Sequence, residues 1–307
     1  MCRDTSADPS FHGKVITVTV PSIRPRASVV IPAHNEAAVI ERCLTALLSD
    51  AEPGEWDVVV AANGCVDDTV ARVGRSAHPV RCVELPVAGK IDALRAADEV
   101  LTVFPRIYLD ADVVLSITAA RALRDGLNTE QPRAAAPAMR LDLTECSRPA
   151  RAYYRVWQSL PVFGPGYVGS GVYAVNETGH RRLSPWPSIV NDDEYVRRRF
   201  GSTERATTEG YFTVRPARTV RALLRRGRRT RAGGHELALY VPDLEVGSGG
   251  SSRRHVASLA RKPREWGGVA IFLGVTVVAE LWAKIGRRGA VSWGRDDSSR
   301  EIGVTRG

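Results

Sequence analysis

Cysteine is scarce in this chain, and its spacing is irregular. The cysteines number five, which is odd, and none belongs to a Cys-x-x-Cys pair: Cys2, Cys43, Cys65, Cys82 and Cys146. This pattern argues against a disulfide framework and against a zinc site. Reduced, buried thiols in a cytosolic protein are the expected state.

Long apolar runs are also missing. The N-terminus has no apolar signal-peptide core, so we expect a protein that is not exported. One apolar stretch, 267–279, stops at Glu280, and its thirteen residues are too few to cross a bilayer of ~30 Å as a helix. Two alternatives stay open: a helix packed on the core, or an interfacial membrane helix anchored by Trp266, Trp282 and basic flanks. The expected location is cytoplasmic, with peripheral attachment to the inner face of the plasma membrane in the second case.

Acidic residues are outnumbered by basic ones. Asp and Glu total 34 against 43 Lys and Arg, which gives a net charge of +9. Such a charge favours a polyanionic partner, namely nucleic acid, an anionic membrane surface or a phosphorylated substrate. Between Arg215 and Arg231 there are eight arginines and no acidic residue. Because no aromatic residues are interleaved with them and no reader motif occurs, nucleic acid is not an expected partner.

Apolar strands and amphipathic helices alternate from residue 27 onward. The pattern predicts strands at 28–31, 56–62, 80–85 and 106–109, with helices between them at 36–48, 67–75 and 90–103. A helix at 116–127 and a strand at 134–140 follow, and then the regular alternation stops. Beyond that point we expect a glycine-rich loop, a short strand and a helix, at 164–171, 172–175 and 191–200. The alternation predicts an α/β fold with a doubly wound, mostly parallel sheet and helices on both faces.

Two carboxylates follow the fourth predicted strand. Asp110 and Asp112 come directly after Ile107-Tyr108-Leu109 and are one residue apart. An open parallel sheet binds its ligands at the carboxyl ends of the strands. Paired carboxylates at that edge suit a hard divalent cation that bridges substrate phosphates. The sequence therefore predicts a metal site at Asp110 and Asp112.

Four short motifs follow successive strands, and together they carry a resemblance. They are Pro32-Ala33-His34-Asn35-Glu36, Asn63-Gly64-Cys65-Val66-Asp67-Asp68-Thr69, Gly89-Lys90 and Asp110-Ala111-Asp112. In this order the motifs resemble those of an inverting family-two glycosyltransferase with a GT-A nucleotide-sugar-binding domain, across residues 27–235. The resemblance implies a GT-A fold with a small helical C-terminal appendage. It also implies sugar transfer from a nucleotide-diphosphate-sugar donor, with Mg2+ or Mn2+ as cofactor.

The resemblance places the nucleotide against the first two loops, with contacts from Pro32, Ala33, Glu36, Asn63 and Asp67. The family usually has an Asp-Asp-Gly-Ser type of turn where this chain has Ala62-Asn63-Gly64-Cys65. Because Asn both donates and accepts hydrogen bonds whereas Asp only accepts them, the identity of the base stays open. Asp67 and its neighbour Asp68 could instead do no more than cap the following helix.

The diphosphate and the metal would lie on the other side of the donor. Lys90 would contact the diphosphate or the ribose from the start of a helix, and its alternative is a solvated surface lysine. Asp110 would approach the ribose and the metal, Asp112 would ligate Mg2+ or Mn2+ directly, and Arg229 could reach the diphosphate.

Arg229 lies in Arg226-Gly227-Arg228-Arg229-Thr230, where many relatives have Gln-x-x-Arg-Trp. Both Gln and Trp are replaced, and no set of spanning helices is present, which argues against a processive polysaccharide synthase. The other arginines of this run are expected at a solvated or lipid-facing surface.

Inversion requires a base on the side of the sugar opposite the leaving group. The resemblance assigns this role to the acids that open the helix at 191–200, with Asp193 as the base and Asp192 in reserve. The alternative is that both acids only cap that helix. Gly169, Ser170 and Gly171 would line the acceptor pocket, because glycine lets a sugar approach the backbone closely. The acceptor would be a hydroxyl of a glycan, a lipid-linked sugar or a small molecule, in cell-envelope or exopolysaccharide synthesis by analogy.

Two other enzyme classes share some of these features. A haloacid-dehalogenase-like phosphatase would use Asp110 as nucleophile, Asp112 as acid/base and the distant acids Asp192 and Asp193 as metal ligands. That family carries the motif on its first strand, whereas three strand–helix units precede it here. Nucleotidyltransferases share the fold, but their glycine-rich, arginine-bearing first loop is absent after the first strand.

The expected division of the chain has four parts. A mobile lead covers residues 1–25, and the GT-A domain covers 26–246, with a nucleotide-binding half at 26–115 and an acceptor half at 116–246. A flexible linker at 247–256 and a basic C-terminal helix and tail at 257–307 follow.

Overall fold

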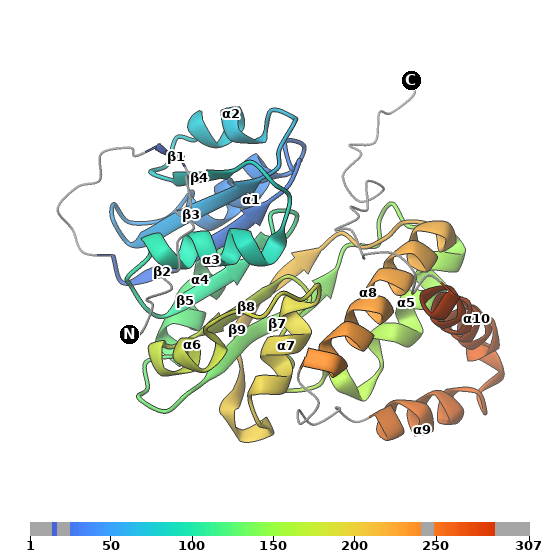
Figure 1. Cartoon of the computed structure of the whole chain (residues 1–307). Coiled ribbons are helices and arrows are strands. Elements are labelled where there is room, and N and C mark those ends of the chain that lie inside the picture. The colour runs from blue at the N-terminus through green and yellow to red at the C-terminus, as the bar shows by residue number, and fades with distance from the viewer. Residues whose placement is uncertain (1–13, 17–24, 241–248, 286–307) are drawn as a thin grey trace, which may run out of the picture.

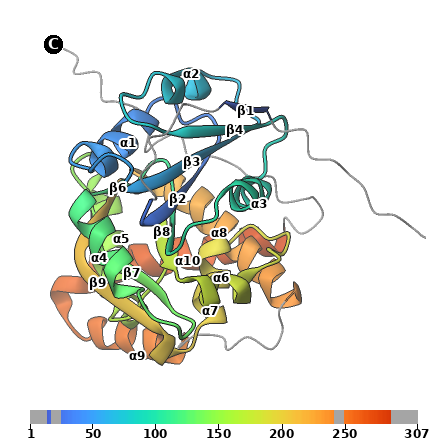
Figure 2. The same ribbon diagram turned by 90° about the vertical axis from the view of Figure 1, so that its left-hand side faces the viewer.

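The computed structural model describes residues 14–16, 25–240 and 249–285. Within them, nine strands form one sheet, and helices cover both of its faces (Figures 1 and 2). The predicted lead at 1–25, the start of the linker at 247–248 and the tail from 286 onward lie wholly or largely outside the described residues. The predicted α/β class and the alternation up to residue 140 are confirmed.

The parallel half of the sheet has the strand order β4-β3-β2-β5, with β2 (Ala27–Ala33), β3 (Trp56–Asn63), β4 (Arg81–Leu85) and β5 (Arg106–Leu109). Every residue of β2 is buried, and its side chains alternate between two hydrophobic cores, with Val29 and Ile31 in one and Val30 in the other. A strand that is buried on both faces needs consecutive apolar residues. This is why these strands read as continuous apolar runs. The short β1 (Lys14–Ile16) pairs antiparallel with β4 at the edge.

Helices fill the two faces of this half. The first core contains side chains from α1 (Ile40–Leu48), α2 (Thr69–Gly74) and α4 (Ile117–Gly126). The second contains side chains from α3 (Lys90–Val100), α6 (Glu177–Leu183) and α7 (Asp192–Arg199). Helix α4 begins after Ser116, whose hydroxyl accepts a bond from the Ala119 amide at 3.3 Å and so satisfies one of the amides left unpaired at a helix start.

The other half of the sheet is mixed. β8 (Val172–Val175) pairs antiparallel with both β5 and β7 (Ala134–Leu141), and β9 (Arg205–Val214) runs parallel to β7 and pairs with β6 (Val114–Leu115). The sequence pattern did not predict β9, since much of this strand is exposed and polar. It also missed α6 and the helix α5 (Arg148–Gln158).

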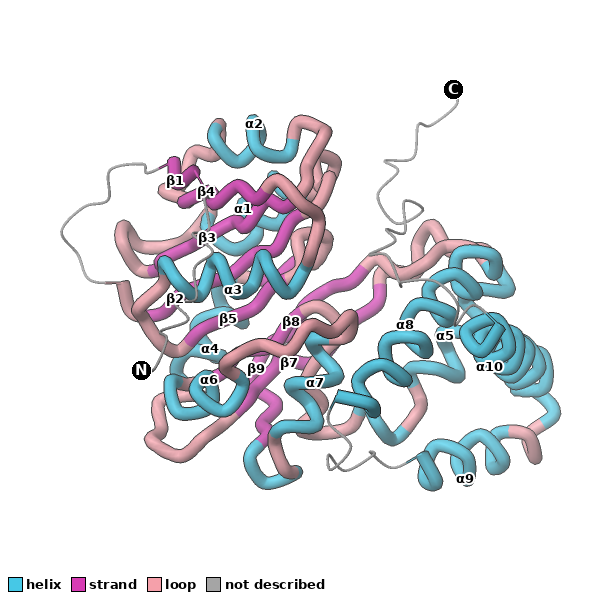
Figure 3. The backbone as a smooth tube through the Cα atoms, viewed as in Figure 1, coloured by secondary structure: helices cyan, strands magenta, loops and turns pink. Residues whose placement is uncertain are grey.

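Four helices form a lobe beside the mixed half (Figure 3). α10 (Trp266–Ile285) packs against α5 and α8 (Val220–Tyr240), and α9 (Gly249–Leu259) lies along the outer end. The predicted linker is wrong from Gly249 onward, where α9 begins. Val256 and Leu259 join a small core with Phe272, and this packing outweighs the weak helix propensity of the glycines and serines. The wider division into domains stays a prediction.

Helix α10 is longer than its apolar run. Glu280 does not end the helix, because its carboxylate pairs with Arg231 at 2.7 Å and His235 at 3.3 Å on α8. With the turn before it, the segment Pro263–Ile285 has 23 residues and contains an 18-residue window with a mean hydropathy of 1.8, so by length and composition it could cross a membrane. The helix is thus longer than the thirteen residues of the apolar stretch, and its relation to a membrane stays a prediction.

The four described cysteines are free thiols, as expected, and Cys2 lies outside the described residues. Burial raises the pKa of Cys82 to about 12, so this thiol is not reactive at neutral pH.

Candidate active site

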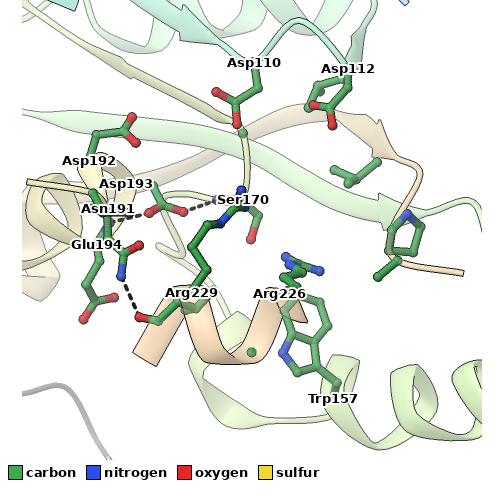
Figure 4. Close-up of a pocket in the computed structure, with 18 of the residues that line it drawn as sticks. Asp110, Asp112, Trp157, Ser170, Asn191, Asp192, Asp193, Glu194, Arg226 and Arg229 are labelled. Carbon is green, nitrogen blue, oxygen red and sulfur yellow. Dashed lines mark hydrogen bonds between the residues drawn. The ribbon is translucent and has the colours of Figure 1, made fainter. Parts of the chain in front are cut away.

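A cavity of about 610 Å³ opens at the carboxyl ends of β2 and β5, between the sheet and the helical lobe. Many of the predicted site residues line it: Pro32, Glu36, Lys90, Asp110, Asp112, Ser170, Gly171, Asp192, Asp193 and Arg229. Ala33, Asn63, Asp67 and Gly169 are not in its lining. Figure 4 shows Asp110 and Asp112 on one side, the acids of α7 on a second side, and Arg226 and Arg229 facing them from α8.

Lys90 lies between the acids after β5 and the acids of α7 and forms ion pairs with both groups. Its ammonium lies 2.7 Å from Asp110 Oδ1 and 2.9 Å from Asp192 Oδ1. Burial alone would lower the pKa of Lys90, but the two carboxylates outweigh it and raise that pKa above its ordinary value. The prediction of a functional position for Lys90 therefore fits better than a solvated surface lysine. Since an ammonium has three N–H groups, one is left for a ligand in the cavity.

Asp192 is buried, with only 5% of its side chain exposed, and both of its oxygens are engaged. Oδ1 meets Lys90, and Oδ2 accepts a hydrogen bond from the Tyr173 hydroxyl at 3.0 Å. Burial raises the pKa of Asp192, and the Lys90 ammonium offsets part of this rise. With these contacts Asp192 holds Lys90 in place.

Asp193 faces the loop that carries Gly169, Ser170 and Gly171. Its Oδ2 accepts a hydrogen bond from the Ser170 amide at 3.1 Å, and its Oδ1 accepts one from the Glu194 amide at 2.8 Å. All three loop residues have positive φ, at 131°, 61° and 98°. A Cβ at Gly169 would stand 3.3 Å from Asp193, and one at Gly171 only 2.7 Å from Val113 Cγ2. The glycines thus allow the loop to pass close to Asp193 and to the end of β5.

Asp110 and Asp112 are carried by the turn after β5. The Asp110 amide donates to the Gly171 carbonyl at 2.8 Å, and Arg42 donates to the Asp112 carbonyl at 3.1 Å, so both ends of the turn are fixed. Among the described residues, no three His, Cys, Asp or Glu side chains gather closely enough to hold a metal ion. Two carboxylate groups nevertheless fit an ion such as Mg2+, which takes its other ligands from water and substrate phosphates.

The first two loops are bound to each other. The Asn63 side chain is fully buried and donates to the Ala33 and Ala61 carbonyls at 2.9 and 3.1 Å, while its Oδ1 accepts from the Gly89 amide at 3.0 Å. Asp67 accepts from the Ala37 amide at 3.1 Å and from the Thr69 amide at 3.0 Å. In this arrangement Asn63 and Asp67 position the loops, and neither side chain points into the cavity.

Sequence reasoning missed the aromatic and basic walls of the cavity. Tyr153 and Trp157 from α5 and Phe272 from α10 line it, together with Arg215, Arg226 and Arg231, which were expected on a solvated or lipid-facing surface. That expectation is wrong for Arg226 and Arg231, which are half-buried at the cavity, whereas Arg215 is exposed. The spacing of Tyr153, Tyr154 and Trp157 could have indicated an aromatic helix face, but no sequence signal shows that such a face borders a cavity.

Residues 28–169 match the family model described as Glycosyl transferase family 2. No curated protein matches the chain. A solved mannosyltransferase from Pyrobaculum calidifontis, in complex with GDP-Man and Mn2+, is similar with 18% identity over 87% of this chain and 90% of its own, at a TM-score of 0.56. Glucosyl-3-phosphoglycerate synthase from Mycobacterium tuberculosis, in complex with UDP, is similar with 25% identity over 73% and 82%, at a TM-score of 0.50.

These matches confirm the resemblance drawn from the four strand-end motifs, and none supports the phosphatase alternative. The matched residues hold β2 to β5, the turn with Asp110 and Asp112, and the loop up to Gly169. The part of the chain that builds the donor side of the cavity thus matches glycosyl transferase family 2, and the protein is a glycosyltransferase with the GT-A fold.

Proposed function

We propose that this enzyme transfers a sugar from a nucleoside-diphosphate donor to an acceptor hydroxyl with inversion, and that Mg2+ or Mn2+ assists the transfer. The observation that carries the proposal is the division of the acids in one cavity. Asp110 and Asp112 lie at the end of β5, while Asp193 lies apart from them on α7 (Figure 4). Inversion needs this division, because the base and the leaving group act on opposite sides of the sugar.

Asp112 and Asp110 would hold the metal ion. A bound divalent ion would supply charge stabilisation for the departing diphosphate. The two solved structures named above contain GDP-Man with Mn2+ and UDP, which supports a nucleotide as the ligand of this chain. Pro32 and Glu36, which line the cavity, would border the nucleotide, with Ala33 buried behind them.

Lys90 adds positive charge beside the diphosphate. Asp110 and Asp192 occupy two of its N–H groups, and the third would donate to a phosphate oxygen. Arg229, on the facing helix α8, would approach the same oxygens, since a guanidinium suits phosphate well.

Asp193 would accept the proton of the acceptor hydroxyl as that hydroxyl attacks. The amides of Ser170 and Glu194 keep its carboxylate oriented. Asp192 would not share this role, because its two oxygens already bind Lys90 and Tyr173.

The test compares Asp193→Asn with Asp125→Asn, an exposed acid at the end of α4 that serves as a matched control. We expect Asp193→Asn to lose transfer by about 10²–10⁴-fold, because it removes the proton acceptor. Its affinity for UDP or GDP with Mn2+ should stay within about twofold of the native value. Nucleotide binding is read by thermal shift and transfer by release of the nucleoside diphosphate. Normal turnover of Asp193→Asn would show that the base is another residue.

Helix α10 supports a second part of the proposal, peripheral attachment to an anionic membrane. Its outer face exposes large apolar side chains, including Trp266 at 61%, Leu281 at 54% and Ile285 at 76%. Exposed Lys262 and Arg264 precede it, and Arg228 of α8 lies over the Trp282 ring. An apolar face with basic and tryptophan borders suits the interface of an anionic bilayer. An enzyme held there would work on the inner face of the plasma membrane, in cell-envelope or exopolysaccharide synthesis.

A further inference from the structure

One wall of the cavity is aromatic and runs from the outer helix to the proposed base. Phe272 of α10 contacts Tyr153 of α5, with ring centroids 5.4 Å apart. Trp157, one turn further along α5, contacts Phe163 at 4.1 Å, and Phe163 contacts Tyr167 at 4.8 Å. The Tyr167 hydroxyl bonds to the Ser170 hydroxyl at 2.7 Å, and the Ser170 amide donates to Asp193. An acceptor that reaches Asp193 along this wall would pass over a continuous apolar surface.

Arg226 lies on the same wall and differs from the other cations of the cavity. Lys90, Arg197, Arg215 and Arg231 all form ion pairs with carboxylates, and Arg229 also has a polar or electrostatic contact. Within the part of the chain that the structure describes, Arg226 has no carboxylate at ion-pair distance. Its guanidinium instead lies over the Trp157 ring, 5.6 Å from the centroid (Figure 4). A half-buried guanidinium without a counter-charge is suited to an anionic ligand.

We propose that the acceptor is an anionic amphiphile, with a phosphate or carboxylate that binds Arg226 and an apolar chain that packs on Trp157, Tyr153 and Phe272. This inference rests on the proposed function, since it names the acceptor of the same reaction. The donor does not account for these features. Its diphosphate already has Lys90, Arg229 and the Asp110–Asp112 turn, and a nucleotide sugar has no apolar chain for the aromatic wall.

Helix α10 links this acceptor site to the proposed membrane face. Phe272 and Thr276 line the cavity, whereas Leu273 and Val277, one residue further on, are 45% and 54% exposed on the outer face. A single helix therefore borders both the cavity and the surface that would meet the bilayer. A lipid with an anionic head group could pass from the bilayer to Asp193 around this helix.

The test measures binding by titration calorimetry to the full-length protein, saturated with UDP or GDP and Mn2+. The ligands are dodecyl phosphate below its micelle concentration, inorganic phosphate, and dodecyl maltoside. We expect dodecyl phosphate to bind at least about tenfold more tightly than either of the others, because only it has both the charge and the chain. Arg226→Ala should weaken its binding by about ten- to a hundredfold, and Arg226→Lys should restore part of the loss. Arg225→Ala, an exposed arginine of the same helix, is the matched control and should bind like the native protein.

Phe272→Ala tests the contribution of the ligand's apolar chain separately from that of its charged phosphate. It should weaken binding of dodecyl phosphate and leave inorganic phosphate unchanged. Equal affinity for dodecyl phosphate and inorganic phosphate would overturn the apolar part of the proposal, and equal affinity for dodecyl maltoside would overturn the anionic part. An Arg226→Ala variant that binds UDP or GDP normally and dodecyl phosphate unchanged would overturn the site itself. Loss of nucleotide binding by the native protein would instead contradict the proposed function.

Discussion

Replacement of Lys90 by methionine is the sharpest test of how the site is held together. The native ammonium is 17% exposed and stands between Asp110, 35% exposed, and Asp192, 5% exposed. Methionine keeps most of the side-chain volume but leaves Asp192 buried without its counter-charge. Removal of one partner from a buried ion pair costs about 3–5 kcal/mol. Because Asp110 can turn toward water, we expect the lower end, about 3 kcal/mol, which for a domain of this size lowers the melting temperature by about 6–12 °C.

The loss of stability in the Lys90→Met variant should depend on pH. Without Lys90, nothing offsets the burial that already raises the pKa of Asp192. A carboxyl whose folded pKa lies above its unfolded value, ~3.9, favours the folded state when it is protonated and loses that contribution as pH rises through the folded pKa. The variant should therefore be least destabilised at acidic pH and most destabilised at neutral and alkaline pH. The double variant Lys90→Met/Asp192→Asn should recover part of the stability at high pH, because the buried charge is gone.

Urea unfolding followed by far-UV circular dichroism, near pH 5 and near pH 8, measures both effects. Lys262→Met replaces an exposed lysine and is the control, expected within about 0.5 kcal/mol of the native protein at both pH values. The reasoning is refuted if Lys90→Met is as stable as this control at high pH. It is equally refuted if the double variant is no more stable than the single one, because Asp192 would then carry no buried charge.

Three further predictions concern the metal, the loop and the outer helix. Asp112→Asn, or chelation of Mn2+ with EDTA, should weaken binding of UDP or GDP by about tenfold or more in titration calorimetry, and unchanged binding would exclude Asp112 as a ligand. Gly171→Ala should lower the free energy of unfolding by about 1–3 kcal/mol in urea unfolding, because the new Cβ would stand 2.7 Å from Val113 Cγ2 at a φ of 98°. Gly74→Ala is the control and should have little effect, since no atom lies within 4 Å of its Cβ. The native protein should sediment with vesicles that contain phosphatidylglycerol and not with vesicles of pure phosphatidylcholine. Leu281→Glu should abolish this sedimentation without a change in melting temperature. Equal binding to both kinds of vesicle would contradict the role of the basic residues that border α10.

The sequence predicted the donor half of the fold closely, because each strand there is buried on both faces and each helix has one buried stripe. β5, for example, was expected at 106–109 and occupies those residues. β9 was not predicted because its exposed residues interrupt the apolar pattern. α8 was not predicted because its many arginines obscure the periodicity of the buried residues Ala222, Leu223 and Leu237. Arg226 and Trp157 could not be predicted as neighbours, since they meet across two helices that are distant in sequence.

The sequence pattern predicts the acidic pair Asp192 and Asp193, but only the structure distinguishes the roles of the two acids. The sequence predicts an acidic pair at the start of a helix, but adjacent residues on a helix point about 100° apart, so the pair cannot act as one group. Which acid faces the cavity depends on how α7 is rotated, and this rotation is set by Tyr195 and Val196 packing into the core. Those contacts turn Asp192 inward to Lys90 and Tyr173 and leave Asp193 at the Ser170 loop. The assignment of Asp193 as base therefore depends on two apolar residues that take no part in the chemistry.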